Sequence, residues 1–394
     1  MALKSGGGRR GSVVGGACAA GGVAVLLTSV WGVGPWREAS GQVVAAAPQA
    51  NEVTIASPRP YFVPLNGQGP SLSAGRVAWT ANTPQGPAGS PIDRIYVYNL
   101  AQRQLSTPVR SHYGTAGFIG GFALAGSALA YVDTGVTPSR IFTWRVCIVD
   151  LRHGGTTTVL TSPPGATSFI PPQIAFDGTR LLVLQSMSRQ AGAFESTATL
   201  YTPSRHTSEV LARLSSPTTS FADPALARDA ALWTTQTFGQ HPSSRLNAYD
   251  MRRRSLRVLP VGDVSQLAAS GDLVAWKSGL TSGPGRIGLY SVQSGRVLSD
   301  DLAHSDKAIY PAIGGGFVSW TAIDFSRVCI YSVATRQVIY KTPAVPQRVY
   351  GLSAISDSTT GARDAAVSWV YTANVSSKTA MRGYVVVRVV SSQN

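Results

Sequence analysis

The segment "AASGDLVAW", Ala268–Trp276, followed by "IGLYSVQSGRVL", Ile287–Leu298, indicates the fold most clearly. It predicts a short strand, a Gly-Asp turn, a second strand that carries a tryptophan, then a third and a fourth strand joined by a hairpin turn. The strands are apolar runs of β-branched and aromatic residues, and no long segment of helical periodicity competes with them. We therefore predict a four-stranded antiparallel sheet for this part of the chain.

The same pattern recurs along the chain from Ser71 onwards, and its second strand is the clearest marker of each repeat. This strand reads "RVAWT" around Trp79, "ALAYV" around Tyr131, "LLVLQ" around Val183, "ALWTT" around Trp233, "LVAWK" around Trp276, "FVSWT" around Trp320 and "AVSWV" around Trp369. Successive markers are about 43 to 52 residues apart, a spacing that fits four short strands with their turns. The sequence thus predicts an all-β propeller of seven blades. A six-bladed ring is the alternative, because Val183 is placed by spacing alone.

The last repeat supplies only three strands, "YGLSAI", "AAVSWVY" and "GYVVVRVV", before the sequence stops at Asn394. The β-prone segment "NEVTIASP", Asn51–Pro58, lies just before the first repeat and belongs to none of them. We expect it to pair with the last blade and close the ring, because such pairing removes both open sheet edges.

Tryptophan and cysteine positions follow the same register. Five of the eight tryptophans occupy the marker position, where a large ring suits the space between neighbouring blades. Cys147 and Cys329 hold equivalent third-strand positions in repeats that are not neighbours, so we expect both to be buried and no disulfide between them. The three cysteines lack metal-ligand spacing, and we predict neither a metal nor another cofactor.

The N-terminal part differs from the rest of the chain. Lys4, Arg9 and Arg10 precede residues 11–36, which carry no charge and include the apolar run Val23–Val33. We interpret residues 1–36 as a signal peptide or an uncleaved signal anchor, residues 37–51 as a flexible linker and residues 52–394 as the propeller. The expected location is the outer face of the cytoplasmic membrane, through residues 11–36, or the exterior if the chain is cleaved near Ala47.

The charge balance indicates the class of partner. Thirty-four lysines and arginines against 19 acidic residues give a net charge of +15, which attracts anions such as wall polymers, glycans and lipid head groups. The arginines are scattered rather than gathered in a stripe with interleaved aromatics, and the export signal also argues against nucleic acid. The sequence does not predict an oligomeric state.

The repeat pattern of Ala268–Leu298 and of "IAFDGTRLLVL", Ile174–Leu184, resembles that of the TolB-like and WD-type propeller repeat family. The resemblance extends over most of residues 52–390. This resemblance implies a propeller fold. It also implies a relationship to exported proteins that bind partners. Some propellers of similar pattern accompany a serine hydrolase domain. The Asp177-Gly178 turn keeps part of the family's Ser-Pro-Asp-Gly turn, whereas Ala74-Gly75 and Gly314-Gly315 do not.

No catalytic motif accompanies the repeats. A G-x-S-x-G elbow, a P-loop, a dinucleotide fingerprint and an H-E-x-x-H pair are all absent from the sequence. Propellers place functional groups on the loops that enter their innermost strands, at the mouth of the central channel. The candidate binding residues at that mouth are His112, Tyr113, Phe221, Asp223, His304, Asp306, Lys307, Tyr310 and Tyr350.

We therefore expect a non-catalytic module that binds a protein or an anionic polymer through the channel mouth and a basic rim. The alternative is an extracytoplasmic carbohydrate-active or lyase-type enzyme. It would use the loop His304–Tyr310 together with Asp223, because acid–base chemistry needs His, Asp or Lys side chains in close proximity.

Overall fold

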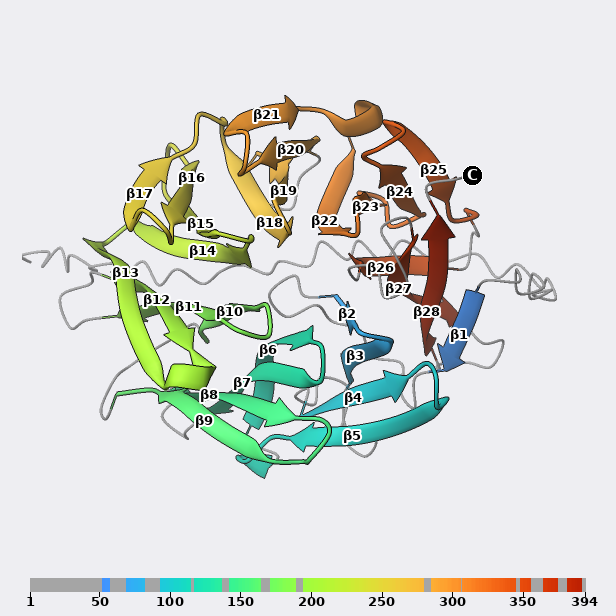
Figure 1. Cartoon of the computed structure of the whole chain (residues 1–394), viewed down its shortest axis with the longest axis horizontal. Coiled ribbons are helices and arrows are strands. Elements are labelled where there is room, and N and C mark those ends of the chain that lie inside the picture. The colour runs from blue at the N-terminus through green and yellow to red at the C-terminus, as the bar shows by residue number, and fades with distance from the viewer. Residues whose placement is uncertain are drawn as a thin grey trace, which may run out of the picture. The chain divides into compact units, whose positions relative to one another are not determined.

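The computed structural model describes residues 52–56, 69–81, 93–114, 117–136, 142–163, 171–188, 194–279, 285–305, 307–344, 348–355, 364–374 and 381–391. These residues form seven four-stranded antiparallel sheets arranged as the blades of a ring (Figure 1). The seven-bladed prediction is confirmed, and the six-bladed alternative is wrong. The predicted signal or anchor segment and the linker lie outside the described residues. Within the described part of the chain, no helix has the length and apolar character needed to cross a membrane.

The blades follow one another along the chain, and each begins with its innermost strand. The first three blades consist of β2 (Ser71–Ser73), β3 (Arg76–Ala81), β4 (Arg94–Asn99) and β5 (Gln104–Arg110); β6 (Gly117–Ala125), β7 (Ala128–Val136), β8 (Phe142–Asp150) and β9 (Thr156–Thr161); and β10 (Gln173–Phe176), β11 (Leu181–Ser188), β12 (Phe194–Thr202) and β13 (Thr207–Ser216). The next three consist of β14 (Thr219–Leu226), β15 (Ala230–Thr237), β16 (Ser243–Asp250) and β17 (Ser255–Val258); β18 (Val264–Ser270), β19 (Leu273–Ser278), β20 (Ile287–Ser291) and β21 (Arg296–Ser299); and β22 (Ala308–Gly314), β23 (Phe317–Ala322), β24 (Val328–Ser332) and β25 (Gln337–Lys341). Two 3₁₀ turns, η3 (Pro203–Arg205) and η4 (Leu302–His304), complete the described elements.

The seventh blade is built from both ends of the propeller sequence. It contains β26 (Arg348–Ile355), β27 (Asp364–Asn374) and β28 (Met381–Ser391), and its outermost strand is β1 (Glu52–Ala56). β1 pairs antiparallel with β28, with Glu52 opposite Arg388 and Ala56 opposite Tyr384. Ile55 of β1 is buried with Val385 and Val387 of β28.

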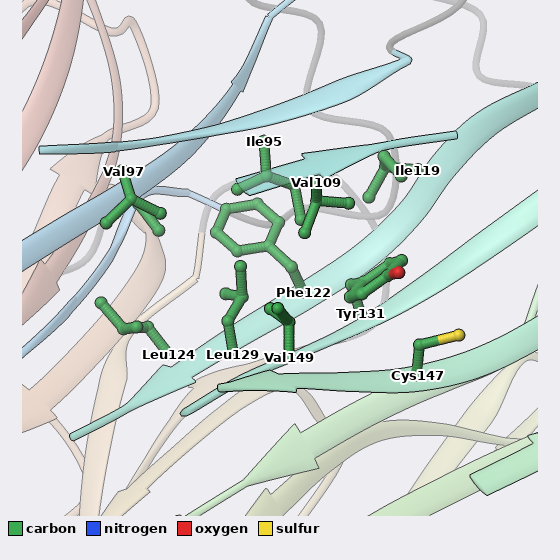
Figure 2. Close-up of a cluster of buried hydrophobic side chains, with 11 residues drawn as sticks. Ile95, Val97, Val109, Ile119, Phe122, Leu124, Leu129, Tyr131, Cys147 and Val149 are labelled. Carbon is green, nitrogen blue, oxygen red and sulfur yellow. The ribbon is translucent and has the colours of Figure 1, made fainter. Parts of the chain in front are cut away.

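The core consists of seven apolar clusters, and each lies between one blade and the next. Figure 2 shows the cluster between the first two blades, where Ile95, Val97 and Val109 meet Phe122 and Tyr131. Each marker residue of the repeat belongs to a different cluster and packs toward the preceding blade; these are Trp79, Tyr131, Val183, Trp233, Trp276, Trp320 and Trp369. The predicted position of the tryptophans between blades is confirmed, and burial of each large side chain contributes about 1.5–3 kcal/mol.

Both cysteines of the propeller are buried and free. Cys147 lies on β8 and Cys329 on β24, in clusters at different blade interfaces. The predicted absence of a disulfide between them is confirmed.

The regular strand order gives the ring two distinct faces. The fourth strand of a blade crosses to the first strand of the next by a short connection, such as residues 217–218 between β13 and β14. All these crossings lie at one face, which we call the crossover face. The turns between first and second strands and between third and fourth strands lie at the opposite face, which we call the hairpin face. First and third strands therefore begin at the crossover face, and second and fourth strands begin at the hairpin face.

Candidate functional site

Three inner strands carry the same local distortion at the same point. The pairing register shifts around Asp223 in β14, Gln266 in β18 and Tyr310 in β22. These residues have φ angles of 53°, 55° and 54°, in the left-handed region that non-glycine residues rarely adopt. Each is thus the extra residue of a β-bulge, and the bulge turns its backbone N–H away from its own sheet.

The bulges join neighbouring blades through hydrogen bonds. The backbone N–H of Asp223 donates to Oε1 of Gln173 in β10 at 2.8 Å. The backbone N–H of Gln266 donates to the Asp223 carboxylate. The backbone N–H of Tyr310 donates to Oε1 of Gln266 at 2.7 Å. These four residues, which we call the inner ladder, link the third, fourth, fifth and sixth blades along the inner wall of the ring.

The carboxylate of Asp223 is the only acidic group of the inner ladder. Its Oδ2 accepts hydrogen bonds from Thr234 Oγ1 at 3.0 Å and from Gln236 Nε2 at 2.8 Å. Burial raises the pKa of Asp223 above its ordinary value, and the bonds from Thr234, Gln266 and Gln236 and the charge of Lys277 offset only part of this effect. The side chain nevertheless keeps partial exposure at the inner wall.

Lys277 lies on β19, directly after the marker Trp276, and its side chain is fully buried. Its Nζ lies 3.5 Å from the carbonyl oxygen of Ser278 and 3.4 Å from that of Gly279. Burial lowers the pKa of Lys277, and the negative charge of Asp223 opposes this shift. An acid with a raised pKa and a base with a lowered pKa thus interact electrostatically beside the inner ladder.

A second cluster lies at the crossover face, where the chain enters the second blade. Asp133 of β7 is fully buried and accepts hydrogen bonds from Ser111 Oγ at 2.7 Å and from the His112 backbone N–H at 3.0 Å. Arg145 of β8 pairs with the same carboxylate at 2.8 Å. His112 is exposed and meets the ring of Tyr113 edge-on at 5.5 Å between centroids. The buried ion pair thus fixes the loop that carries both predicted residues.

The loop before the sixth blade has a similar support. Asp301 Oδ1 accepts hydrogen bonds from the backbone N–H of Ser305 at 2.7 Å and from its hydroxyl at 3.2 Å. The Ser305 hydroxyl oxygen in turn accepts from the backbone N–H of Ile287 at 2.8 Å. His304 is fully exposed, with Nδ1 4.0 Å from Asp301 Oδ2, and Lys307 is also exposed.

The structure divides the predicted site residues among several places. Asp223 and Tyr310 are brought together through Gln266, but both lie within inner strands rather than on entering loops. Phe221 is buried against Trp233, at 5.8 Å between ring centroids, so it belongs to the core and not to an exposed surface. Tyr350 lies within β26 and Asp306 lies outside the described residues.

The described part of the structure gives no contact between His304 and Asp223, which the enzyme alternative would use together. Among the described residues, no hydrogen bond or ion pair joins the two side chains, and His304 points into solvent beside Asp301. No group of three or more His, Cys, Asp or Glu side chains suited to a metal ion occurs in the described part of the chain.

The sequence prediction missed Gln173, Gln266, Lys277 and Asp133. The four ladder positions carry three different residue types, Gln, Asp and Tyr, which hides their equivalence. Their common place in the repeat is a signal that could have found them: each ladder residue lies four positions before the residue at its first turn, namely Asp177, Ala227, Ser270 and Gly314. Lys277 stands where the fourth and sixth blades have Thr234 and Thr321.

Comparison with known proteins identifies the fold. A scan against protein-family models finds no match, and a search of curated proteins finds no relative. Among solved structures, the β-propeller domain of the Trilobed protease from Pyrococcus furiosus matches with a TM-score of 0.53 and 12% identity, over 80% of this chain and 94% of that one.

Two further structures match at the same level. A chain of the mitotic checkpoint complex gives a TM-score of 0.52 and 12% identity, over 90% of this chain and all of that one. The acylaminoacyl peptidase of Pyrococcus horikoshii matches with a TM-score of 0.52 and 12% identity over 81% of this chain. The match covers only about half the length of that peptidase. At these identities the similarity concerns the fold alone, and by its fold the chain is a β-propeller with repeats that resemble the TolB-like and WD-type pattern.

Proposed function

We propose that this chain is an exported, non-catalytic binding module whose propeller presents its crossover face to a partner protein or an anionic polymer. The partner would contact the loops that precede the second and sixth blades, around His112 and Tyr113 and around His304 and Lys307. These side chains stand at the face opposite the hairpin turns and include the exposed cationic groups of the predicted channel mouth.

The carboxylate support under the His112 loop carries this proposal. A fully buried Asp133 holds the loop by its side chain and its backbone at once, through Ser111 and His112. A loop that is already fixed loses little conformational entropy when a partner binds, which favours affinity. The inner ladder supports the same interpretation, because its polar groups are engaged by backbone N–H groups of neighbouring blades and stiffen the scaffold.

Site-specific photo-crosslinking of the full-length chain in its own cells tests this function. A benzophenone side chain placed at His112 or at Lys307 is expected to give a discrete adduct with a protein or an anionic polymer. The same group at Thr157, an exposed residue of the outer strand β9, is the control and is expected to give none. Equal labelling at all three positions, or none at any, would contradict a binding surface at the crossover face.

The opposed pKa shifts of Asp223 and Lys277 favour one alternative, a lyase-type enzyme acting on an acidic polysaccharide. Sites of acid–base catalysis often pair a carboxyl group whose pKa is raised with a lysine whose pKa is lowered. In this alternative, the Asp223 carboxyl group would exchange protons with the sugar, and Lys277, whose side chain is fully buried, would act through its charge on Asp223.

Ultraviolet absorbance of the unsaturated product distinguishes the two functions. An enzyme would release such product from acidic polysaccharides and would lose activity in both Asp223→Asn and Lys277→Met. A binding module is expected to show no turnover, and either substitution is then expected to alter stability alone.

A further inference from the structure

An arginine lies in, or directly after, the turn of every described hairpin between a third and a fourth strand. Five of these arginines lie in the turn itself, and Arg296 is the first residue of β21. Six consecutive blades, the first to the sixth, contribute one each: Arg103, Arg152, Arg205, Arg254, Arg296 and Arg336. All six are exposed. We call this set the arginine crown. These turns share the hairpin face and join the two outer strands of each blade, which lie around the periphery of the ring (Figure 1). The crown therefore follows the periphery of that face.

Several crown residues occupy costly backbone conformations. Arg103, Arg254 and Arg336 have φ angles of 52°, 54° and 56°. Glycine or asparagine adopts this left-handed conformation more readily than arginine does. Turn geometry alone therefore does not explain why these three positions carry arginine. A role for the arginine side chain would explain it.

Most of the crown keeps its charge uncompensated. Arg254 pairs with Glu209. Among the residues that the structure describes, no carboxylate lies within ion-pair distance of the other five crown arginines. Other arginines of the hairpin face also form ion pairs with its acidic groups. They are Arg180, Arg228, Arg252, Arg253 and Arg388, which pair with Asp177, Asp272, Asp229, Asp250 and Glu52, respectively. Apart from Glu209, these acidic groups thus pair with arginines outside the crown and leave five of the six crown arginines without an ion pair.

The chain enters the propeller at the same face. β1 is the fourth strand of the seventh blade, and fourth strands begin at the hairpin face, so Glu52 lies there. In the sequence, residues 37–51 lead back from Glu52 to the uncharged segment 11–36. A flexible linker of about 15 residues has a root-mean-square length of roughly 20 Å. A membrane anchor in residues 11–36 would therefore hold the membrane near the crown.

We propose that the hairpin face docks on anionic lipid head groups of the membrane that anchors the chain, with the arginine crown bound to their phosphates. This inference rests on the export included in the proposed function and on the predicted uncleaved anchor in residues 11–36, but it concerns the opposite face. A bilayer presents phosphates over a whole plane and can meet tips spread around a ring, whereas a linear polymer meets only a few of them. Guanidinium groups bind phosphate oxygens in pairs, and basic residues near an anionic bilayer add to the effect of a hydrophobic anchor.

Docking leaves the crossover face directed away from the membrane. The supported loops of His112 and His304 would then face the surroundings, where a partner can reach them. The two faces would thus have separate roles. The crown would orient the module on the membrane, and the crossover face would bind the partner.

A fluorescent reporter on the full-length chain in lipid nanodiscs tests this proposal. An environment-sensitive dye is attached at Ala334→Cys, on the exposed hairpin turn of the sixth blade, in a chain that also carries Cys18→Ser. Cys147 and Cys329 are buried and escape labelling. Nanodiscs with phosphatidylglycerol are expected to shift the dye emission, nanodiscs of phosphatidylcholine alone are not, and about 0.5 M salt should reverse the shift.

Two triple variants of equal charge separate the crown from a general electrostatic effect. Replacing Arg103, Arg296 and Arg336 by Gln is expected to reduce the docked fraction at least tenfold. Replacing Arg110, Arg245 and Arg286 by Gln removes three exposed arginines near the crossover face and is expected to leave docking unchanged. An equal loss in both variants would overturn the proposal, because net charge would then explain the attraction.

Soluble polyphosphate supplies the remaining outcome. If the dye responds to polyphosphate on phosphatidylcholine nanodiscs but not to phosphatidylglycerol, the crown binds a polymer and the lipid proposal is wrong. The readout involves neither export nor a crossover-face ligand. Failure of docking is therefore distinguishable from failure of the crosslinking experiment at His112.

Discussion

The backbone N–H of Tyr310 in β22 donates to the side-chain Oε1 of Gln266 in β18 at 2.7 Å, and this bond joins the fifth and sixth blades at the inner wall. The left-handed backbone at Tyr310 is what directs its N–H toward the preceding blade. Gln266 repeats the arrangement toward Asp223, and Asp223 toward Gln173. The strain of three bulges is thus offset by three hydrogen bonds between blades.

Removing the acceptor of one ladder bond should destabilise the propeller. In Gln266→Met the side chain keeps its length but leaves the Tyr310 N–H without its partner, and an unsatisfied buried donor costs about 1–3 kcal/mol. Methionine bears the same left-handed backbone cost as glutamine, so the hydrogen bond is the main difference. Urea denaturation should show a lower midpoint. Gln293→Met, in the exposed turn between β20 and β21, is the control and should unfold like the wild type.

The raised pKa of Asp223 makes a signed prediction about pH. A carboxyl group whose pKa is higher in the folded state than in the unfolded chain favours folding most at low pH, and this contribution is lost as pH rises through the folded-state pKa. Asp223→Asn does not titrate. The free energy of unfolding of the variant, minus that of the wild type, should therefore increase between about pH 4 and pH 7.

Asp177 supplies a control of opposite sign. Burial of Asp177 is outweighed by hydrogen bonds from Thr179 and by the bond and charge of Arg180, so that its pKa is lowered. Its contribution to stability is present above the unfolded-state pKa and is lost as pH falls. Over the same pH range, the difference for Asp177→Asn should not increase as it does for Asp223→Asn. If the difference for Asp223→Asn also fails to increase over this pH range, the Asp223 carboxyl group is ionised as readily in the folded protein as in the unfolded chain.

The fold was predictable because every blade repeats one apolar pattern at one spacing. Trp79, Trp233 and Trp276 fix the register, and a buried interface between blades requires a large apolar side chain at that point. The third blade shows the limit of this signal. Val183 replaces the aromatic ring, yet it is buried opposite Ile174 of β10 and fills the same interface.

The site was less predictable, because its groups act through backbone geometry that residue type does not reveal. Gln173 and Gln266 are ordinary polar residues in the sequence, and only the bulges give them a common role. Phe221 was expected at the channel mouth, but alternation along β14 directs its ring into the core against Trp233. Asp133 was overlooked because a lone acidic residue within an apolar strand gives no sign of the loop that it holds.

Arg180 should be more important for stability than its surface position suggests. Beyond its ion pair with Asp177, its Nη1 donates to the carbonyl oxygen of Arg228 at 2.8 Å and its Nη2 to that of Ala227 at 3.2 Å, across to the fourth blade. Lysine cannot reproduce this forked geometry, so Arg180→Lys should lower the free energy of unfolding by about 1–3 kcal/mol. Arg228→Lys is the matched control, since Arg228 makes one exposed ion pair with Asp272 and should lose at most about 1 kcal/mol.

Gly288 in β20 tests how closely the marker ring packs on its own sheet. Gly288 lies opposite Trp276 of β19, and a methyl group at Gly288 would overlap the six-membered ring of that indole. Glycine within a strand normally costs about 0.5–1 kcal/mol relative to alanine, so Gly288→Ala would stabilise the protein if space were available. Because the indole is buried in the apolar cluster between the fourth and fifth blades, moving it would disturb that packing, and we expect a loss of about 1–3 kcal/mol instead. Thermal unfolding followed by tryptophan fluorescence measures the change, with Gly262→Ala as the control, where an added methyl group meets open space. A stabilised Gly288→Ala would show that Trp276 can turn aside, and that the spacing of strands rather than the fit of this ring sets the blade interface.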